Sequence, residues 1–193
     1  MLGNLSPDIK RINEEDDLRL TVNLKEMFDL PFFPKDDGLR QAIGQAVIDA
    51  IKNKAESGDF LAGSSKKGYS KEYAESEAGI VYGKKTGAKP NLNASGDMLN
   101  SIALDLPTNT DRVVINFLDS LESQKAHGHV NGSDILPKRD FFGLTNSELR
   151  TIAKQFDGEV VDAAALELVG ETVEQGDESD LDFITRLLSE SEN

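Results

Sequence analysis

The chain has 193 residues and no cysteine, which suits one domain with an appendage and excludes disulfides, thiolate nucleophiles and the usual structural zinc sites. No apolar run approaches the roughly 20 residues that span a bilayer, and the first residues lack a secretory signal, so we expect a soluble, unexported protein without membrane contacts. The formal net charge of −14 argues against direct, sequence-specific binding to nucleic acid, because phosphate contacts need clustered lysine and arginine.

The negative charge is concentrated in the last part of the chain. Residues 157–193 contain twelve acidic residues and one basic residue, a net charge of −11, so −14 minus −11 leaves −3 for residues 1–156. We therefore expect a single domain over 1–156 and an acidic C-terminal extension over 157–193.

The N-terminal third contains one clear strand and one clear helix. Ser6-Pro7 is typical of the start of a short helix, and apolar residues alternate over 18–24 as in a half-buried strand. Two prolines interrupt residues 27–34, which we expect to be irregular. After Asp36 and Asp37, apolar residues recur every three or four positions, which predicts an amphipathic helix that ends near residues 57–58.

Residues 62–90 are rich in glycine, serine and lysine, and we interpret them as a flexible basic loop that includes Lys84 and Lys85. A loop of this length is uncommon inside a compact domain and is usually functional or disordered. Two interpretations stay open: a flexible loop exposed to solvent, or an arm that becomes ordered against an acidic neighbour or the tail of another copy.

A hairpin and two more helices are predicted after this loop. Residues 91–99 form a turn into a short helical start, and alternating apolar residues over 102–106 and 113–117 predict an antiparallel pair of strands. One or two helical turns over 119–126 should end at residues 127–129, because Gly128 suggests a turn. Thr145 and Glu148 then form a capping box that opens another helix.

The extension is acidic but has an apolar stripe. The segment after residue 158 could continue as helix to Gly170. Leu181, Ile184 and Leu188 fall on one face of a short amphipathic helix, which either docks on a partner or belongs to an extension that only increases solubility.

Few residues suggest catalysis or metal binding. His127 and His129 lie near Asp134, but a third firm ligand is missing, so we expect no metal and no cofactor. Lys84 and Lys85 lie between two glycines without the remaining residues of a phosphate-binding loop. We therefore expect a protein that is not an enzyme.

The candidate contact surface lies at residues 137–142. Pro137 stiffens the backbone, Arg139 offers a planar guanidinium, and Phe141 and Phe142 offer large rings that could equally belong to the core.

Two segments carry a resemblance to a known family. The run 136–145, LPKRDFFGLT, resembles the "LPxRPFLGLS" signature of phage virion-morphogenesis, or tail-completion, proteins, in which it follows an "H-x-x-G" turn that corresponds to residues 127–132. Residues 91–102 resemble that family's "L-x-x-(S/T)-G-x-(L/M)-x-x-S-I" motif. The resemblance covers roughly residues 39–156; Asp140 replaces the usual proline, Phe142 replaces the usual leucine, and the 62–90 loop is long.

The resemblance implies a structural protein of a tailed phage virion, located at the head–tail junction and in the host cytoplasm during assembly. It implies a homo-oligomeric ring, with a hexamer as one candidate, that contacts the tail terminator, tail tube or connector. A tail terminator or another neck or connector ring protein is the first alternative. An acidic regulatory protein that mimics nucleic acid, and an enzyme or metal-binding protein that uses His127, are the others.

The fold expected from these elements is α+β, with a small, mostly antiparallel sheet packed against a long amphipathic helix. Its strands are those over 18–24, 102–106 and 112–118.

Overall fold

The protein is a four-stranded antiparallel sheet covered by helices, as shown by a computed structural model that describes residues 6, 8–14, 17–65, 67–134 and 136–175, with the backbone alone for 169–175. The strands lie in the order β1-β2-β4-β3. Their bounds are Ile9–Asn13 for β1, Leu18–Asn23 for β2, Ile102–Asp105 for β3 and Arg112–Phe117 for β4. The α+β fold class and the predicted hairpin of β3 and β4 are confirmed.

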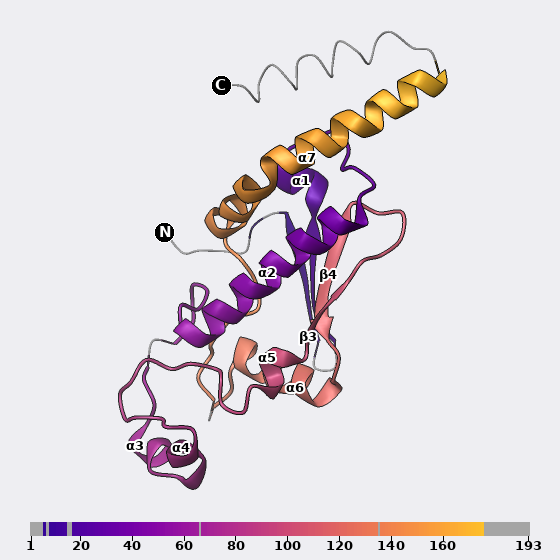
Figure 1. Ribbon diagram of the computed structural model, residues 1–193. Helices are drawn as coiled ribbons and strands as arrows, with labels where there is room; N and C mark the ends of the chain where they lie inside the picture. Colours follow the sequence, from indigo (N-terminus) through magenta and orange to yellow (C-terminus); the bar gives the residue numbers. More distant parts are fainter. Residues whose placement is uncertain (1–5, 7, 15–16, 66, 135, 176–193) are drawn as a thin grey trace.

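The long helix α2, Asp37–Ser57, lies across one face of this sheet (Figure 1). Asp36 accepts a hydrogen bond from the backbone N–H of Leu39 at 2.9 Å, and Gly58 ends the helix with a φ of 71°. The apolar face of the helix meets alternate side chains of β2 and β4, which supply the centre of the core. The core side chains with no exposed surface in these three elements are Ile43, Val47, Ile51, Ala55, Leu20, Val22, Val113 and Ile115.

The prediction of a short helix that starts at Ser6-Pro7 is wrong, because strand β1 begins at Ile9. The Ser6 hydroxyl bonds to the side chains of Asp8 and Asn146 instead of capping a helix, and its backbone N–H donates to Leu144 O at 3.0 Å. β1 then pairs with β2 in register from Ile9 to Asn13. Long-range pairing therefore overrides a local helix signal.

The prediction of irregular chain over residues 27–34 is partly wrong, because residues 27 and 28 belong to the short helix α1, Leu24–Phe28. Asn23 accepts a hydrogen bond from the backbone N–H of Glu26, and Asp29 ends the helix in the left-handed conformation with a φ of 56°. The prolines lie beyond that end, so they limit the helix without preventing it.

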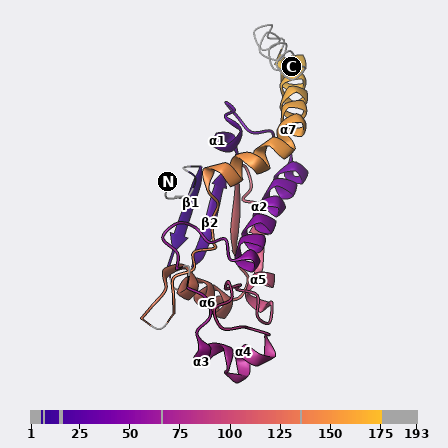
Figure 2. The ribbon, with the colours of Figure 1, turned by 90° about the vertical axis from the view of Figure 1, so that its left-hand side faces the viewer.

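The 62–90 segment was expected to be a loop and contains two short helices, α3, Lys71–Ala74, and α4, Glu77–Val81. Ser70 and Ser76 cap them by accepting hydrogen bonds from backbone N–H groups. Gly79 permits their close approach, since a Cβ there would lie 2.0 Å from a backbone oxygen. In two perpendicular views these helices lie at one end of the molecule (Figures 1 and 2).

The helix after the hairpin, α6, Ser120–Asn131, continues through residues 127–129, so the predicted turn at Gly128 is wrong. Gly132 ends it instead, with a φ of 72°. The short helical start predicted before β3 is confirmed as α5, Asp97–Asn100. A glycine inside a helix lowers stability but does not stop a helix that packs, as α6 does, against β2 and β4.

The last helix, α7, Asn146–Gln175, is opened by the predicted capping box. Glu148 accepts hydrogen bonds from the N–H and hydroxyl of Thr145 at 2.7 and 2.8 Å. The helix continues past the boundary expected at residue 157 and past Gly170, and Val160 and Ala164 on it are buried. The start of the acidic extension is therefore part of the packed structure; Leu181, Ile184 and Leu188 lie outside the described residues.

Candidate functional site

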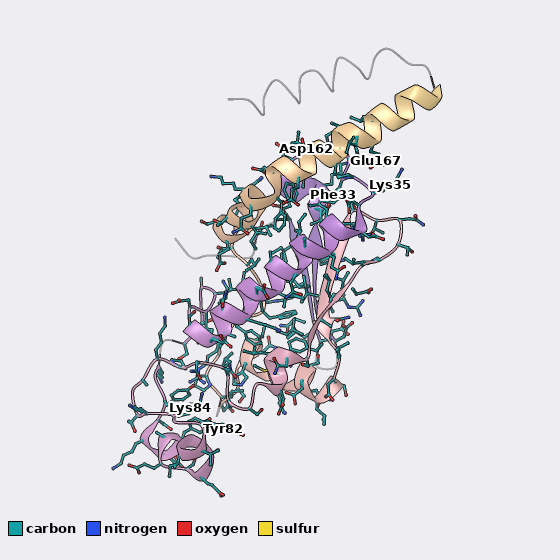
Figure 3. All side chains as sticks on the ribbon, viewed as in Figure 1. Phe33, Lys35, Tyr82, Lys84, Asp162 and Glu167 are labelled. Carbon is teal, nitrogen blue, oxygen red and sulfur yellow. The ribbon has the colours of Figure 1, made fainter. Side chains whose placement is uncertain are left out.

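A cavity of about 500 Å³ lies where the 62–90 segment meets the chain around Arg139. Its lining residues come from separate parts of the chain and are Lys67, Gly68, Tyr69, Ser70, Tyr73, Lys84, Asn91, Leu92, Ala94, His129, Leu136, Pro137 and Arg139. Figure 3 shows Lys84 beside the α3–α4 end of the molecule. We call this cavity the Arg139 pocket.

Backbone hydrogen bonds fix the two sides of the pocket to each other. The N–H groups of Leu61 and Ser65 donate to the carbonyl oxygens of Asp140 and Lys138, both at 2.7 Å. The N–H of Asp140 donates to the Ser64 hydroxyl at 2.9 Å. The first residues of the predicted loop are thus held against the 136–145 segment.

Tyr69 forms the aromatic wall of the pocket. Its hydroxyl donates to the carbonyl oxygen of Asn91 at 2.5 Å and accepts from the Asn91 N–H at 2.9 Å, which fixes the ring. The guanidinium carbon of Arg139 lies 5.5 Å from the ring centroid and the Lys84 ammonium lies 5.6 Å from it. Both distances suit cation–π attraction, so the ring helps to hold two positive charges close together.

Arg139 is buried, with 6% of its surface exposed. Its backbone N–H donates to His129 O at 2.7 Å. Its guanidinium has no hydrogen-bond acceptor and no carboxylate partner among the residues that the structure describes, and its Nε is a buried donor without a partner. Burial lowers the pKa of Arg139, and the nearby Tyr69 and Tyr73 only oppose that shift.

Lys84 is the second buried cation of the pocket. Its ammonium donates to the Asn91 side-chain oxygen and to Asn93 O, the latter at 3.0 Å. Both partners are neutral, and burial lowers the pKa of Lys84. The adjacent Lys85 is exposed and does not line the pocket.

His129 faces the pocket from α6 and is neutral at pH 7. Burial, assisted by the positive charge of Arg139, lowers its pKa to about 4, and its Nδ1 is buried without a partner. His127, two residues earlier on the same helix, points in another direction and lies 2.7 Å from the Asn131 side-chain nitrogen. Over the described ranges, no three residues of the types His, Asp and Glu are grouped to hold a metal ion.

The structure brings together three of the predicted contact residues, Pro137, Arg139 and Lys84, around one pocket. It corrects two others. Phe141 and Phe142 have no exposed surface, and their rings pack 6.2 Å apart in the core, so they cannot form an outer contact in this conformation.

Asp140, which stands where the resembling family has proline, forms a bidentate ion pair with Arg11 of β1 at 2.6 and 3.1 Å. The side chain of Asp140 is 7% exposed and that of Arg11 is 15% exposed, and Arg11 also donates to Phe142 O at 3.1 Å. This position therefore connects the signature segment to the edge of the sheet.

Tyr69 and Tyr73 are pocket residues that the sequence analysis did not identify, and it considered His129 only as a metal ligand. A signal was present, because all three tyrosines of the chain, Tyr69, Tyr73 and Tyr82, lie within a segment that otherwise resembles a polar loop. Aromatic residues are unusual in such a loop and indicate packing or binding.

The two segments that carry the family resemblance meet at this pocket. Asn91, Leu92 and Ala94 of the first and Leu136, Pro137 and Arg139 of the second line it, although more than forty residues separate them in sequence. Comparisons with protein-family models, curated proteins and solved structures found no match to the chain. Among its described helices, none is both long and apolar enough to cross a membrane.

Proposed function

We propose that this chain is a structural virion protein of a tailed bacteriophage that acts in tail completion, joining tail to head at the neck. The observation that carries the proposal is the convergence of the two family-like segments, 91–102 and 136–145, on one pocket. Segments that define a family and are far apart in sequence are expected to meet where the shared function resides.

The exposed surface of this part of the molecule supports a role in contacts. The α3–α4 helices next to the pocket expose Ile80, Val81 and Tyr82, at 69%, 70% and 41% of their surfaces. Adjacent exposed apolar side chains are typical of protein–protein contacts. The partners we propose are other copies in a ring, with a hexamer as one candidate size, and the tail terminator, tail tube or connector.

The test is loss of the protein in the phage that encodes it. Without it, full heads and finished tails should accumulate separately, and electron microscopy of lysates should show both without joined particles. A plasmid copy of the wild-type gene is the control and should restore joined, infectious particles. Normal particles without the protein would refute the proposal, and heads with overlong tails would instead favour a tail terminator.

A further inference from the structure

The Arg139 pocket is lined by cations and by no acidic side chain. Lys67, Lys84 and Arg139 are its charged residues, whereas its other described polar groups come from tyrosine, serine, asparagine and neutral His129. In a protein with a formal net charge of −14, this concentration of positive charge is local. The pocket therefore attracts negative charge.

Arg139 differs from the other strongly buried cations of the described structure. Lys54 pairs with Glu148 at 2.6 Å, and Arg40 pairs with Asp37 at 2.7 Å and also donates to two backbone carbonyl oxygens. Lys84 has two neutral acceptors. Among these four cations, Arg139 alone has a side chain that donates to no acceptor in the described part of the chain, although it is as buried as the other three.

Arg139 is costly to bury, because folding removes water from its Nε–H without replacing the hydrogen bond. Its parallel N–H groups match the two oxygens of a carboxylate. Here the guanidinium lies on the wall of an open cavity, beside a second cation and a fixed aromatic ring. The missing acceptor is thus best supplied from outside the pocket as a carboxylate.

The last part of the chain carries a concentrated source of carboxylates. Residues 157–193 hold a net charge of −11, and Asp157, Glu159 and Asp162 within them are exposed on α7. Figure 3 shows Asp162 and Glu167 toward one end of the molecule and Lys84 toward the other. A rigid helix holds the described acidic residues away from the pocket of their own chain, whereas a second copy can present them.

We propose that the Arg139 pocket binds an Asp or Glu carboxylate from the acidic segment 157–193 of a second copy, with Arg139 as the bidentate partner and Lys84 beside it. This rests on the proposed assembly function and names one partner of its pocket. Because the pocket and the described acidic residues of α7 lie on different surfaces, the contact is head-to-tail, and its repetition gives a closed ring or an open chain.

The test is self-association of the full-length protein, measured by sedimentation velocity at low and high salt. Arg139→Gln should weaken association at least tenfold, and salt should weaken the wild type as well. Lys85→Gln is the matched control, since it removes the same charge from the same segment at an exposed position outside the pocket, and it should leave association unchanged. Equal association by wild type and Arg139→Gln would overturn the proposal.

A peptide of residues 157–193 should bind the protein in a fluorescence anisotropy assay and compete with self-association. The same peptide with every Asp and Glu changed to Asn or Gln should do neither. A single-stranded oligonucleotide is the third ligand; if it binds in an Arg139-dependent way and the acidic peptide does not, the pocket is a nucleic-acid site and the proposal fails. A chain that stays monomeric at every concentration would also refute it.

Folding of the variants is checked by their urea midpoints. Arg139→Gln should be at least as stable as wild type, because it removes an unpaired buried charge, so lower association with retained stability separates binding from folding. If that variant unfolds, neutralising the acidic residues of 157–193 tests the same contact from its other side and should lower association to the same extent. These measurements use no phage particles, so they can fail while the complementation test succeeds, and the reverse.

Discussion

Lys54 and Glu148 connect the C-terminal end of α2 to the first turn of α7. The Lys54 ammonium donates to both carboxylate oxygens of Glu148 at 2.6 and 2.7 Å, and its side chain is 3% exposed. Glu148 also accepts hydrogen bonds from Thr145, so one carboxylate both pairs a buried cation and caps a helix. Burial alone would raise the pKa of Glu148, but the bonds from Lys54 and Thr145 outweigh it and lower the pKa.

We predict that Glu148→Gln lowers the free energy of unfolding by about 2–3 kcal/mol. Glutamine keeps most of the capping box, so the loss comes from leaving the Lys54 ammonium buried without a charge partner. Breaking a fully buried pair costs about 3–5 kcal/mol, and we reduce this because the Glu148 side chain is 40% exposed. Lys54→Met should cost less than about 1 kcal/mol, since it removes the buried charge and keeps the apolar stem.

Urea unfolding followed by circular dichroism measures both variants. Glu75→Gln is the matched control, because Glu75 makes an exposed ion pair with Lys71 at 3.8 Å and should change stability by less than about 0.5 kcal/mol. Equal losses for Glu148→Gln and Lys54→Met would refute the reasoning, as would a Glu148→Gln loss no larger than that of the control. Because the folded pKa of Glu148 is lowered, its contribution is present at neutral pH and should be lost as the pH falls through that folded pKa.

Three further perturbations test other parts of the structure. His129 has a folded pKa of about 4, so between pH 6.5 and 4 the unfolded chain binds a proton that the folded chain does not. The free energy of unfolding should therefore fall by up to about 3 kcal/mol as the pH drops. His129→Asn should remove this pH dependence in urea unfolding curves recorded at several pH values. Asp140→Asn leaves Arg11 without its bidentate partner and should cost about 2–4 kcal/mol in urea unfolding; a loss below 0.5 kcal/mol, on the order of an exposed pair, would contradict the buried pair. Gly58→Ala places a Cβ 2.2 Å from a backbone oxygen at a φ of 71° and should lower the free energy of unfolding by about 2–4 kcal/mol. Gly63→Ala, at a φ of 81° with no atom within 4 Å of the new Cβ, should lower it by about 1 kcal/mol, and thermal melts of both variants measure the difference.

The sequence and the structure give different roles to residues 136–145. The sequence drew attention to this segment as a contact surface, and the structure divides it between two roles. Its first part, with Pro137 and Arg139, lines the pocket, whereas Asp140, Phe141 and Phe142 hold the segment to β1 and the core. Residues 139–144 are all buried, so their roles differ because each side chain meets a different part of the fold.

The sequence by itself determined the elements whose signals are local. Asp36 and the apolar spacing after it defined α2, Thr145 and Glu148 defined the start of α7, and alternation defined β2 and the β3–β4 hairpin. The starts of both helices depend on hydrogen bonds between residues a few positions apart. Alternation along a strand can be read in a short window of sequence even where the pairing partner is distant, as Ile115 of β4 is from Leu20 of β2.

Only the tertiary structure decided the features that depend on distant partners. β1 forms because β2 offers it a pairing edge, although Ser6-Pro7 suggests a helix start. Tyr69 and Arg139 are 70 residues apart in sequence, and the pocket they share exists because backbone bonds from Leu61 and Ser65 hold the two segments together. Burial and charge pairing are properties of the assembled core, so a buried arginine without an acceptor could be recognised only after every neighbour was in place.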